Sequence, residues 1–283
     1  MKLSPRSLVF GAFVIFSVLV SIWGAVLGPV GSEAYGGLNI FAFILVGFAA
    51  QMIDGALGMA YGVSSNTFLL SLGLPPASAS ASVHMAEVFT TGVSGLSHWK
   101  LRNIDTKLAK QLLIPGVLGG VSGAYILTSL DGDLLKPWIS AYLVVMGEII
   151  LYKAFRGVKR SQEPVKHVSL LGLVGGLFDA MGGGGWGPVV TTTLVARGSN
   201  ARVSIGTVNF AEFFVTFAQS VTFILALNFR DYWQVIVGLL LGGVLAAPLA
   251  ALITKRLPLK VLMIIVGVVI IGLSLRTIWM AMF

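Results

Sequence analysis

Residues 54–62, DGALGMAYG, interrupt a long apolar run, and residues 179–187, DAMGGGGWG, interrupt another run 125 positions later. In the same register, residues 83–87 (VHMAE) align with residues 208–212 (VNFAE). Each half of the chain therefore holds an acidic, glycine-rich break, followed by an apolar helix that carries a glutamate. A hydrophobic protein with a broken polar segment in each of two repeats has the sequence pattern of a secondary transporter.

The composition indicates an integral membrane protein. Of the 283 residues, 56% are hydrophobic and only 11% are charged, whereas a soluble domain carries about 25% charged residues. Residues 7–32 and 232–254 contain no charged residue, and about 20 apolar residues suffice to cross the hydrocarbon core of a bilayer. The net charge of +8 is therefore assigned to loops that set membrane orientation. The chain has no cysteine, which excludes disulfides and iron–sulfur ligation.

The repeat divides the chain into four parts. We expect an N-terminal transmembrane helix in residues 1–37, the first repeat in 38–156, a basic cytoplasmic linker in 157–167 and the second repeat in 168–283. The first apolar run is too long for the core of a secretion signal, so we interpret it as a retained helix. Each repeat is expected to contain a broken re-entrant hairpin and three transmembrane helices. The predicted fold class is an all-α polytopic membrane protein with an inverted-topology repeat.

The apolar runs give approximate bounds for these elements. The hairpins are expected at residues 38–73 and 168–197, each of which could instead form two full spans. The other helices are expected at about residues 8–28, 76–97, 108–129, 136–156, 201–227, 231–253 and 259–282.

The basic residues predict the orientation in the inner (plasma) membrane. Most of the 19 lysines and arginines fall within residues 2–6, 100–110, 153–166, 197–202 and 255–260. Loops rich in these residues remain in the cytoplasm. All five basic groups lie in the cytoplasm only if the first hairpin enters and leaves the membrane on the external side. The second hairpin must then enter and leave on the cytoplasmic side. The two repeats are therefore expected to be inverted, with a cytoplasmic N-terminus and an external C-terminus.

A polar stripe follows each break. In the first repeat it consists of His84, Glu87, Thr91, Ser94 and His98. The steps of three and four residues place all five on one helix face. The matching stripe of the second repeat is Asn209, Glu212, Thr216 and Gln219. Lipid cannot satisfy such groups, so we expect both stripes to face the protein interior or a wet cavity. The alternative is hydrogen bonding between helices, which suits the neutral members best.

The glycines of the breaks permit unwound backbone and the close approach of a ligand. If a half-helix begins after each break, its free N–H groups and positive dipole end form an anion site without any basic side chain. The alternative role of these glycines is tight helix packing. Asp54 and Asp179 open the two breaks, where each either binds a coupling proton or cation or caps the next half-helix. Tyr61 and Trp186 occupy matching positions and are candidates for the wall of the site.

These features resemble the sulfite exporter TauE/SafE family. The resemblance rests on the two Asp- and Gly-rich breaks, the following helix with an Ala-Glu pair and the basic central linker, and it covers about residues 38–282. Members of that family are membrane proteins linked with export or uptake of sulfite, organosulfonates and related small sulfur anions. The resemblance implies anion contacts from the glycines of the breaks and from His84 and Asn209. It names neither the substrate nor the direction of transport.

The candidate site residues combine both arguments. The predicted substrate-binding residues are Gly58, Tyr61, Gly62, His84, Thr91, Gly183, Gly184, Gly185, Trp186, Asn209, Thr216 and Gln219. The predicted coupling residues are His84, Glu87, Glu212, Asp54 and Asp179. Ionised glutamates would repel an anion, but burial favours the neutral carboxyl group, and histidine changes charge near neutral pH. We therefore expect proton-linked transport with His84 and Glu87 as the coupling groups.

The predicted function is a secondary transporter, not an enzyme, that exports sulfite, a sulfonate or a related oxyanion. The expected partners are this anion and the lipid bilayer, with no nucleic acid, cofactor or metal, and self-association is left open. An anion channel and a cation-coupled carrier of similar architecture remain alternatives. A remote alternative is an intramembrane protease that uses two aspartates, or Ser94 with His98, but it leaves the repeat unexplained.

Overall fold

The computed structural model describes residues 40–57, 59–156, 167–197, 199–227, 232–254 and 259–283. Within these ranges the chain is helical and contains no β-strand, which confirms the all-α prediction for this part. The helix expected at residues 8–28, Gly58 and nearly all of the linker at residues 157–167 lie outside the described residues.

The described helices follow the expected order. The first repeat contains α2 (Ile40–Leu57), α3 (Tyr61–Ser71), α4 (Pro76–Lys100), α5 (Thr106–Ser129) and α6 (Gly132–Arg156). The second contains α7 (Val168–Gly182), the π-helix η2 (Gly187–Thr191), α8 (Thr192–Ala196), α9 (Ala201–Ala226), α10 (Trp233–Thr254) and α11 (Leu259–Met282). Four of the described helices are long and apolar enough to cross a membrane: Thr106–Ser129, Gly132–Arg156, Arg202–Ala226 and Lys260–Met282. The bounds of α4 and α6 extend beyond the expected ones because their polar ends carry no hydropathy signal.

Both predicted breaks separate two helices. In the first repeat, Ala60 precedes α3 with a φ of 90°. In the second, Gly183 and Gly184 follow α7 with φ of 65° and 143°. The φ of Gly184 is accessible to glycine but strained for other residues. The glycine-rich sequence thus ends α7 by allowing the chain to turn out of the helix, and the π-helix η2 begins the next arm.

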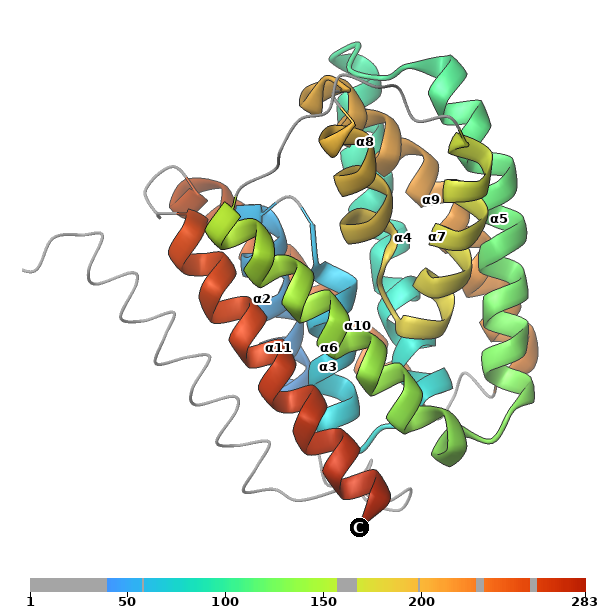
Figure 1. The fold of residues 1–283 in the computed structure, drawn as a ribbon, viewed down its shortest axis with the longest axis vertical. Coiled ribbons are helices and arrows are strands. Elements are labelled where there is room, and N and C mark those ends of the chain that lie inside the picture. The colour runs from blue at the N-terminus through green and yellow to red at the C-terminus, as the bar shows by residue number, and fades with distance from the viewer. Residues whose placement is uncertain (1–39, 58, 157–166, 198, 228–231, 255–258) are drawn as a thin grey trace, which may run out of the picture.

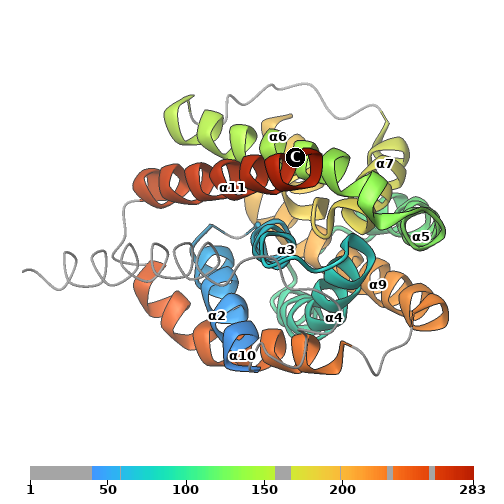
Figure 2. The ribbon, with the colours of Figure 1, turned by 90° about the horizontal axis from the view of Figure 1, so that it is seen from below.

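Helices of one repeat pack mainly on helices of the other. α2 lies along α10 and α7 lies along α5, whereas α4 pairs with α9 and α6 pairs with α11 (Figures 1 and 2). Along α4 and α9, Gly92 faces Phe213 while Trp99 contacts Phe210, so these two helices run antiparallel.

The α6–α11 pair is antiparallel as well. A Cβ on Gly147 would lie 2.7 Å from the Ile271 side chain, and a Cβ on Gly267 would lie 2.6 Å from Leu151. Residues that come later in α6 therefore contact residues that come earlier in α11. The α4–α9 and α6–α11 pairs are each formed by corresponding helices of the two repeats.

The helix that precedes each break, α2 in the first repeat and α7 in the second, is the first arm of its broken segment. Glycines bring both first arms into backbone contact with the other repeat. A Cβ on Gly172 of α7 would lie 2.8 Å from the Leu112 carbonyl oxygen, and a Cβ on Gly176 would lie 2.2 Å from that of Gly116. A Cβ on Gly242 of α10 would lie 2.0 Å from the carbonyl oxygen of Ile44 in α2. Small residues permit such close helix packing in membranes. The first arms, α2 and α7, are thereby fixed to α10 and α5.

Candidate functional site

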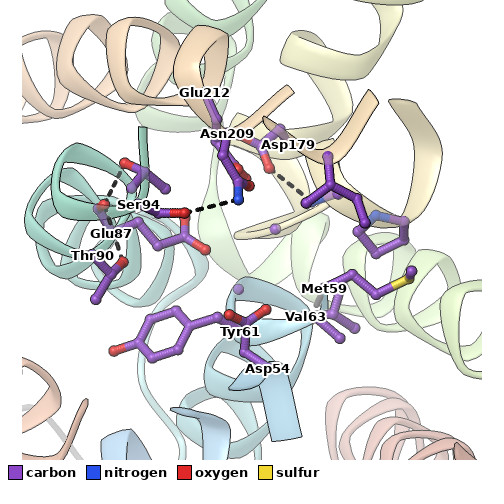
Figure 3. Close-up of a pocket in the computed structure, with 18 of the residues that line it drawn as sticks. Asp54, Met59, Tyr61, Val63, Glu87, Thr90, Ser94, Asp179, Asn209 and Glu212 are labelled. Atoms are coloured by element: carbon purple, nitrogen blue, oxygen red, sulfur yellow. Dashed lines mark hydrogen bonds between the residues drawn. The ribbon is translucent and has the colours of Figure 1, made fainter. Parts of the chain in front are cut away.

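A cavity of about 300 Å³ lies where the two breaks meet the polar faces of α4 and α9 (Figure 3). This volume falls at the lower end of the range for ligand pockets, about 300–1,000 Å³. The lining residues are Gln51, Asp54, Met59, Ala60, Tyr61, Gly62, Val63, Glu87, Thr90, Thr91, Ser94, His98, Asp179, Gly184, Gly185, Gly187, Pro188, Ile205, Asn209 and Glu212. The cavity is therefore built from both repeats.

The two breaks touch each other beside the cavity. A Cβ on Gly62 would lie 2.6 Å from Gly184 Cα, and a Cβ on Gly184 would lie 2.3 Å from the Gly62 carbonyl carbon. Asn66 of α3 donates a hydrogen bond from Nδ2 to the Gly182 carbonyl oxygen over 2.6 Å. Only glycine provides the space for this approach, so here the duplicated glycines join the two repeats at one site.

Asp179 organises the second break. Its Oδ1 accepts hydrogen bonds from the backbone amides of Gly185 (2.7 Å) and Trp186 (2.9 Å). Its Oδ2 accepts one from Gln219 Nε2 (3.0 Å) and lies 3.2 Å from His84 Nε2. Asp179 is almost completely buried. It caps the arm that follows its own break and ties α7 to α4 and α9.

The first break lies against Glu87 of α4. Glu87 Oε1 lies 2.9 Å from the position that a Cβ on Gly62 would occupy, and Asp54, Tyr61 and Gly62 line the cavity together with Glu87. Of the two roles left open for the aspartates, capping is seen at Asp179. Glu87 Oε2 has no hydrogen-bond partner in the part of the chain that the structure describes.

The cavity is strongly acidic. Asp54, Glu87, Asp179 and Glu212, from α2, α4, α7 and α9, all line it and surround the same space (Figure 3). Among the described residues no lysine or arginine lines this cavity, and His98 is its one basic side chain. No group of three histidine or acidic side chains close enough to hold a metal ion occurs in the described ranges.

Most of the first predicted stripe faces the cavity. Thr91, Ser94 and His98 line it together with Glu87. Asn209 on α9 donates from Nδ2 to Ser94 Oγ over 2.9 Å, so the two stripes meet across the α4–α9 contact. Because Ser94 Oγ is the acceptor in this bond, its own hydrogen remains available to a ligand.

Several predicted substrate-binding residues lie behind the cavity wall instead. They are His84, Gly183, Trp186, Thr216 and Gln219. Trp186 donates from Nε1 to the Val208 carbonyl oxygen (3.2 Å), and Thr216 donates to that of Glu212 (2.8 Å). His84 and Gln219 contact Asp179. These side chains support the residues that line the cavity. Gly58, another predicted substrate-binding residue, lies outside the described residues.

The cavity occupies one half of the α4–α9 pair. Its lining runs from Glu87 to His98 on α4 and from Ile205 to Glu212 on α9. Because the helices are antiparallel, both segments extend toward the α4–α5 and α8–α9 connections. The other half is packed: the ring of Phe223 lies 5.9 Å from that of His84, and both residues are fully buried.

Lys153 is a residue whose position the sequence did not indicate. It was grouped with the cytoplasmic basic residues of 153–166, but it belongs to the last turn of α6 and is only 7% exposed. Its Nζ donates to Thr192 Oγ1 over 2.5 Å and lies 3.5 Å from the sulfur of Met59. Lys153 therefore touches both broken segments. Its position before the end of the apolar run, rather than in the linker, was the available signal.

Comparison with known proteins identifies the family of this chain. The chain matches the family described as Sulfite exporter TauE/SafE over residues 43–277. It is 43% identical over 256 residues to "Probable membrane transporter protein YtnM" of Bacillus subtilis (strain 168), and the match covers 86% of this chain and 84% of that protein. No solved structure matches the chain. Both breaks and both polar stripes lie inside the matched region, and the protein belongs to the TauE/SafE family of membrane transporters.

Proposed function

We propose that the protein is a secondary transporter that exports a small sulfur-containing oxyanion, such as sulfite or a sulfonate, across the inner (plasma) membrane in a proton-linked cycle. Family membership supports the transporter class, and the description of the family supports a sulfite-like substrate. The observation that carries the proton link is the position of Glu87, whose carboxyl oxygen Oε1 lies beside Gly62 at the edge of the cavity.

Glu87 occupies a place suited to an anion. Gly62 belongs to the first turn of α3, where unpaired N–H groups and the helix dipole favour negative charge. A substrate oxyanion would use the amide of Gly62, together with the hydroxyl group of Ser94. Protonation of Glu87 removes the negative charge beside this amide, so the anion and the proton would bind together.

The remaining carboxyl groups strengthen this argument. Two like charges about 4 Å apart repel each other by about 4 kcal/mol at an effective dielectric constant of 20. An anion that enters a cavity lined by four carboxyl groups therefore binds only when some of them are protonated. In this proposal the anion binds only after protons have neutralised part of the cavity.

We also propose that the two repeats have inverted topology. The antiparallel packing of α4 with α9 and of α6 with α11 supports this. A two-fold axis in the membrane plane makes corresponding helices antiparallel, whereas an axis along the membrane normal makes them parallel. The equivalent pairings of α2 with α10 and of α7 with α5 fit the same axis.

The conformation described here is proposed to face the cytoplasm. The cavity extends toward the two connections that carry Lys100, Arg102, Arg197 and Arg202, and basic loops mark the cytoplasmic side. The opposite end is closed. An exporter has to load its substrate from the cytoplasm, so this conformation is the one expected for substrate binding.

A cation-coupled carrier is the second candidate, because carboxyl groups also bind cations. Purified protein in liposomes tests both. We expect saturable sulfite uptake that responds to an imposed pH gradient and does not change when sodium is replaced by choline. Glu87→Gln should lose the response to pH. Glu148→Gln is the matched control, since Glu148 is an exposed glutamate on α6 and its replacement should leave the response intact.

Each other outcome has a distinct meaning. Sulfite flux that follows sodium rather than pH supports the cation-coupled carrier. Flux that does not saturate supports a channel. Folded protein without sulfite flux contradicts the proposed substrate, and an unchanged pH response in Glu87→Gln contradicts the role of Glu87.

A further inference from the structure

The hydrogen-bond partners of His84 indicate how many protons the buried contact between His84 and Asp179 holds. His84 Nδ1 lies 2.7 Å from the Ser80 carbonyl oxygen, which only accepts hydrogen bonds. The Ser80 hydroxyl group, 3.3 Å from the same nitrogen, donates its hydrogen to the Ala180 carbonyl oxygen at 2.5 Å. Both neighbours of Nδ1 are therefore acceptors, so Nδ1 carries a hydrogen.

The second ring nitrogen faces a carboxyl oxygen. His84 Nε2 lies 3.2 Å from Asp179 Oδ2. With Nδ1 already protonated, a neutral imidazole would present a lone pair at Nε2 to a carboxylate that also presents lone pairs. Two acceptors at this distance, both buried, would repel each other. One additional proton must lie between Nε2 and Oδ2.

The surroundings of Asp179 assign this proton to the histidine. The carboxyl group also accepts from the amides of Gly185 and Trp186 and from Gln219 Nε2. Three donors besides His84 stabilise the carboxylate form. The pair is then an imidazolium and a carboxylate, which together are neutral and suited to complete burial.

We propose that His84 and Asp179 form a dedicated proton-binding site at the closed end of the cavity. Asp179 lines the cavity, whereas His84 lies behind it and is fully buried. A proton on His84 can therefore reach the cavity through Asp179. This inference rests on the proposed proton-linked function and adds a second proton-binding site beside Glu87.

The corresponding positions of the repeat do not form a second site of this kind. The position that corresponds to His84 is Asn209, and the one that corresponds to Asp179 is Asp54. Asn209 cannot bind a proton, and it donates to Ser94 instead. The two halves are thus chemically unequal at this point, and only the half that is closed in this structure holds the imidazolium.

Other titratable groups face the pair and will contribute to any pH profile. They are Glu87 on α4, Glu212 on α9, Asp54 on α2 and Tyr142 on α6. A readout specific to His84 is therefore needed, rather than a pH profile of transport alone.

Nitrogen NMR of histidine-labelled protein in lipid bilayers provides that readout without any substrate. The chain has three histidines, so His98→Asn and His167→Asn assign two of the signals and leave that of His84 by elimination. We expect both ring nitrogens of His84 to carry a hydrogen at neutral pH. Asp179→Asn should abolish this state. A neutral His84 with an unprotonated Nε2 at that pH overturns the proposal.

Transport then tests the link to function. In liposomes, the ratio of sulfite uptake with and without a pH gradient should fall to unity in His84→Asn, which copies the residue of the other repeat. A ratio that stays at the wild-type value overturns the proposal. If the wild-type protein itself moves no sulfite, the proposed substrate fails, while the NMR result still decides whether the proton site exists.

Discussion

Gly62 and Gly184 lie in backbone contact, so that a Cβ on Gly184 would approach the Gly62 carbonyl carbon to 2.3 Å. One glycine comes from each repeat, and each follows a break in a helix. Through this contact the two broken segments act as one unit beside the cavity. A movement of one segment against the other has to change this contact, which makes it a sensitive point for substitution.

Gly184→Ala should destabilise the protein and impair transport. The added methyl group meets backbone atoms at Gly62, and a φ of 143° is strained for alanine. We expect a loss of about 1–3 kcal/mol from strain and overpacking, measured as a lower melting temperature in detergent. Gly272→Ala is the control, because nothing lies within 4 Å of its Cβ position. Equal melting temperatures for the two variants would contradict the contact.

Asp179→Asn should be far more destabilising than Asp54→Asn. In the proposed ion pair, the first change removes the counter-charge that holds a proton on the buried His84, and breaking a buried charge pair costs about 3–5 kcal/mol. Asp54 is half-buried and lines the cavity, and asparagine of nearly the same size can replace it there without leaving a charge unpaired. Thermal unfolding of both variants checks this order. A larger loss in Asp54→Asn would contradict the central role of Asp179.

Thr192→Val should destabilise the protein through Lys153. The threonine hydroxyl group is the oxygen that accepts from the Lys153 ammonium group, and a buried polar group that loses its partner costs about 1–3 kcal/mol. Lys153→Met combined with Thr192→Val should regain most of this loss, since both polar groups are then gone. A double variant as unstable as the sum of the two single variants would indicate that the pair does not interact.

Ser94→Cys and Gln219→Cys should differ in their reaction with a water-soluble thiol reagent. The two positions correspond in the repeat, but Ser94 lines the cavity while Gln219 is fully buried. The chain has no cysteine, so each variant carries a single thiol. We expect Ser94→Cys to be labelled from the cytoplasmic side and sulfite to slow this labelling. Faster labelling of Gln219→Cys, or labelling of Ser94→Cys from outside only, would contradict a cavity that faces the cytoplasm.

The helical architecture could be predicted from the sequence because it follows from local properties. The apolar runs have the length of membrane helices, and both acidic, glycine-rich stretches separate two helices in the structure. The polar stripe of α4 was visible as spacing, and Glu87, Thr91, Ser94 and His98 do share the cavity. Its first member, His84, follows the same spacing but lies behind Asp179. Helical periodicity predicts the face of a residue and not the depth at which a cavity ends.

Glycine content and periodicity act along the chain, so they alone place the helix breaks and the polar side chains that accompany them. The partners of these groups follow from the packing of the helices. Asp179 receives His84 and Gln219 from two other helices, and Lys153 turns inward to Thr192 instead of joining the exposed cytoplasmic bases. Such contacts join residues that are 39 to 95 positions apart, and they depend on how antiparallel helices from two repeats are aligned, which no local pattern records.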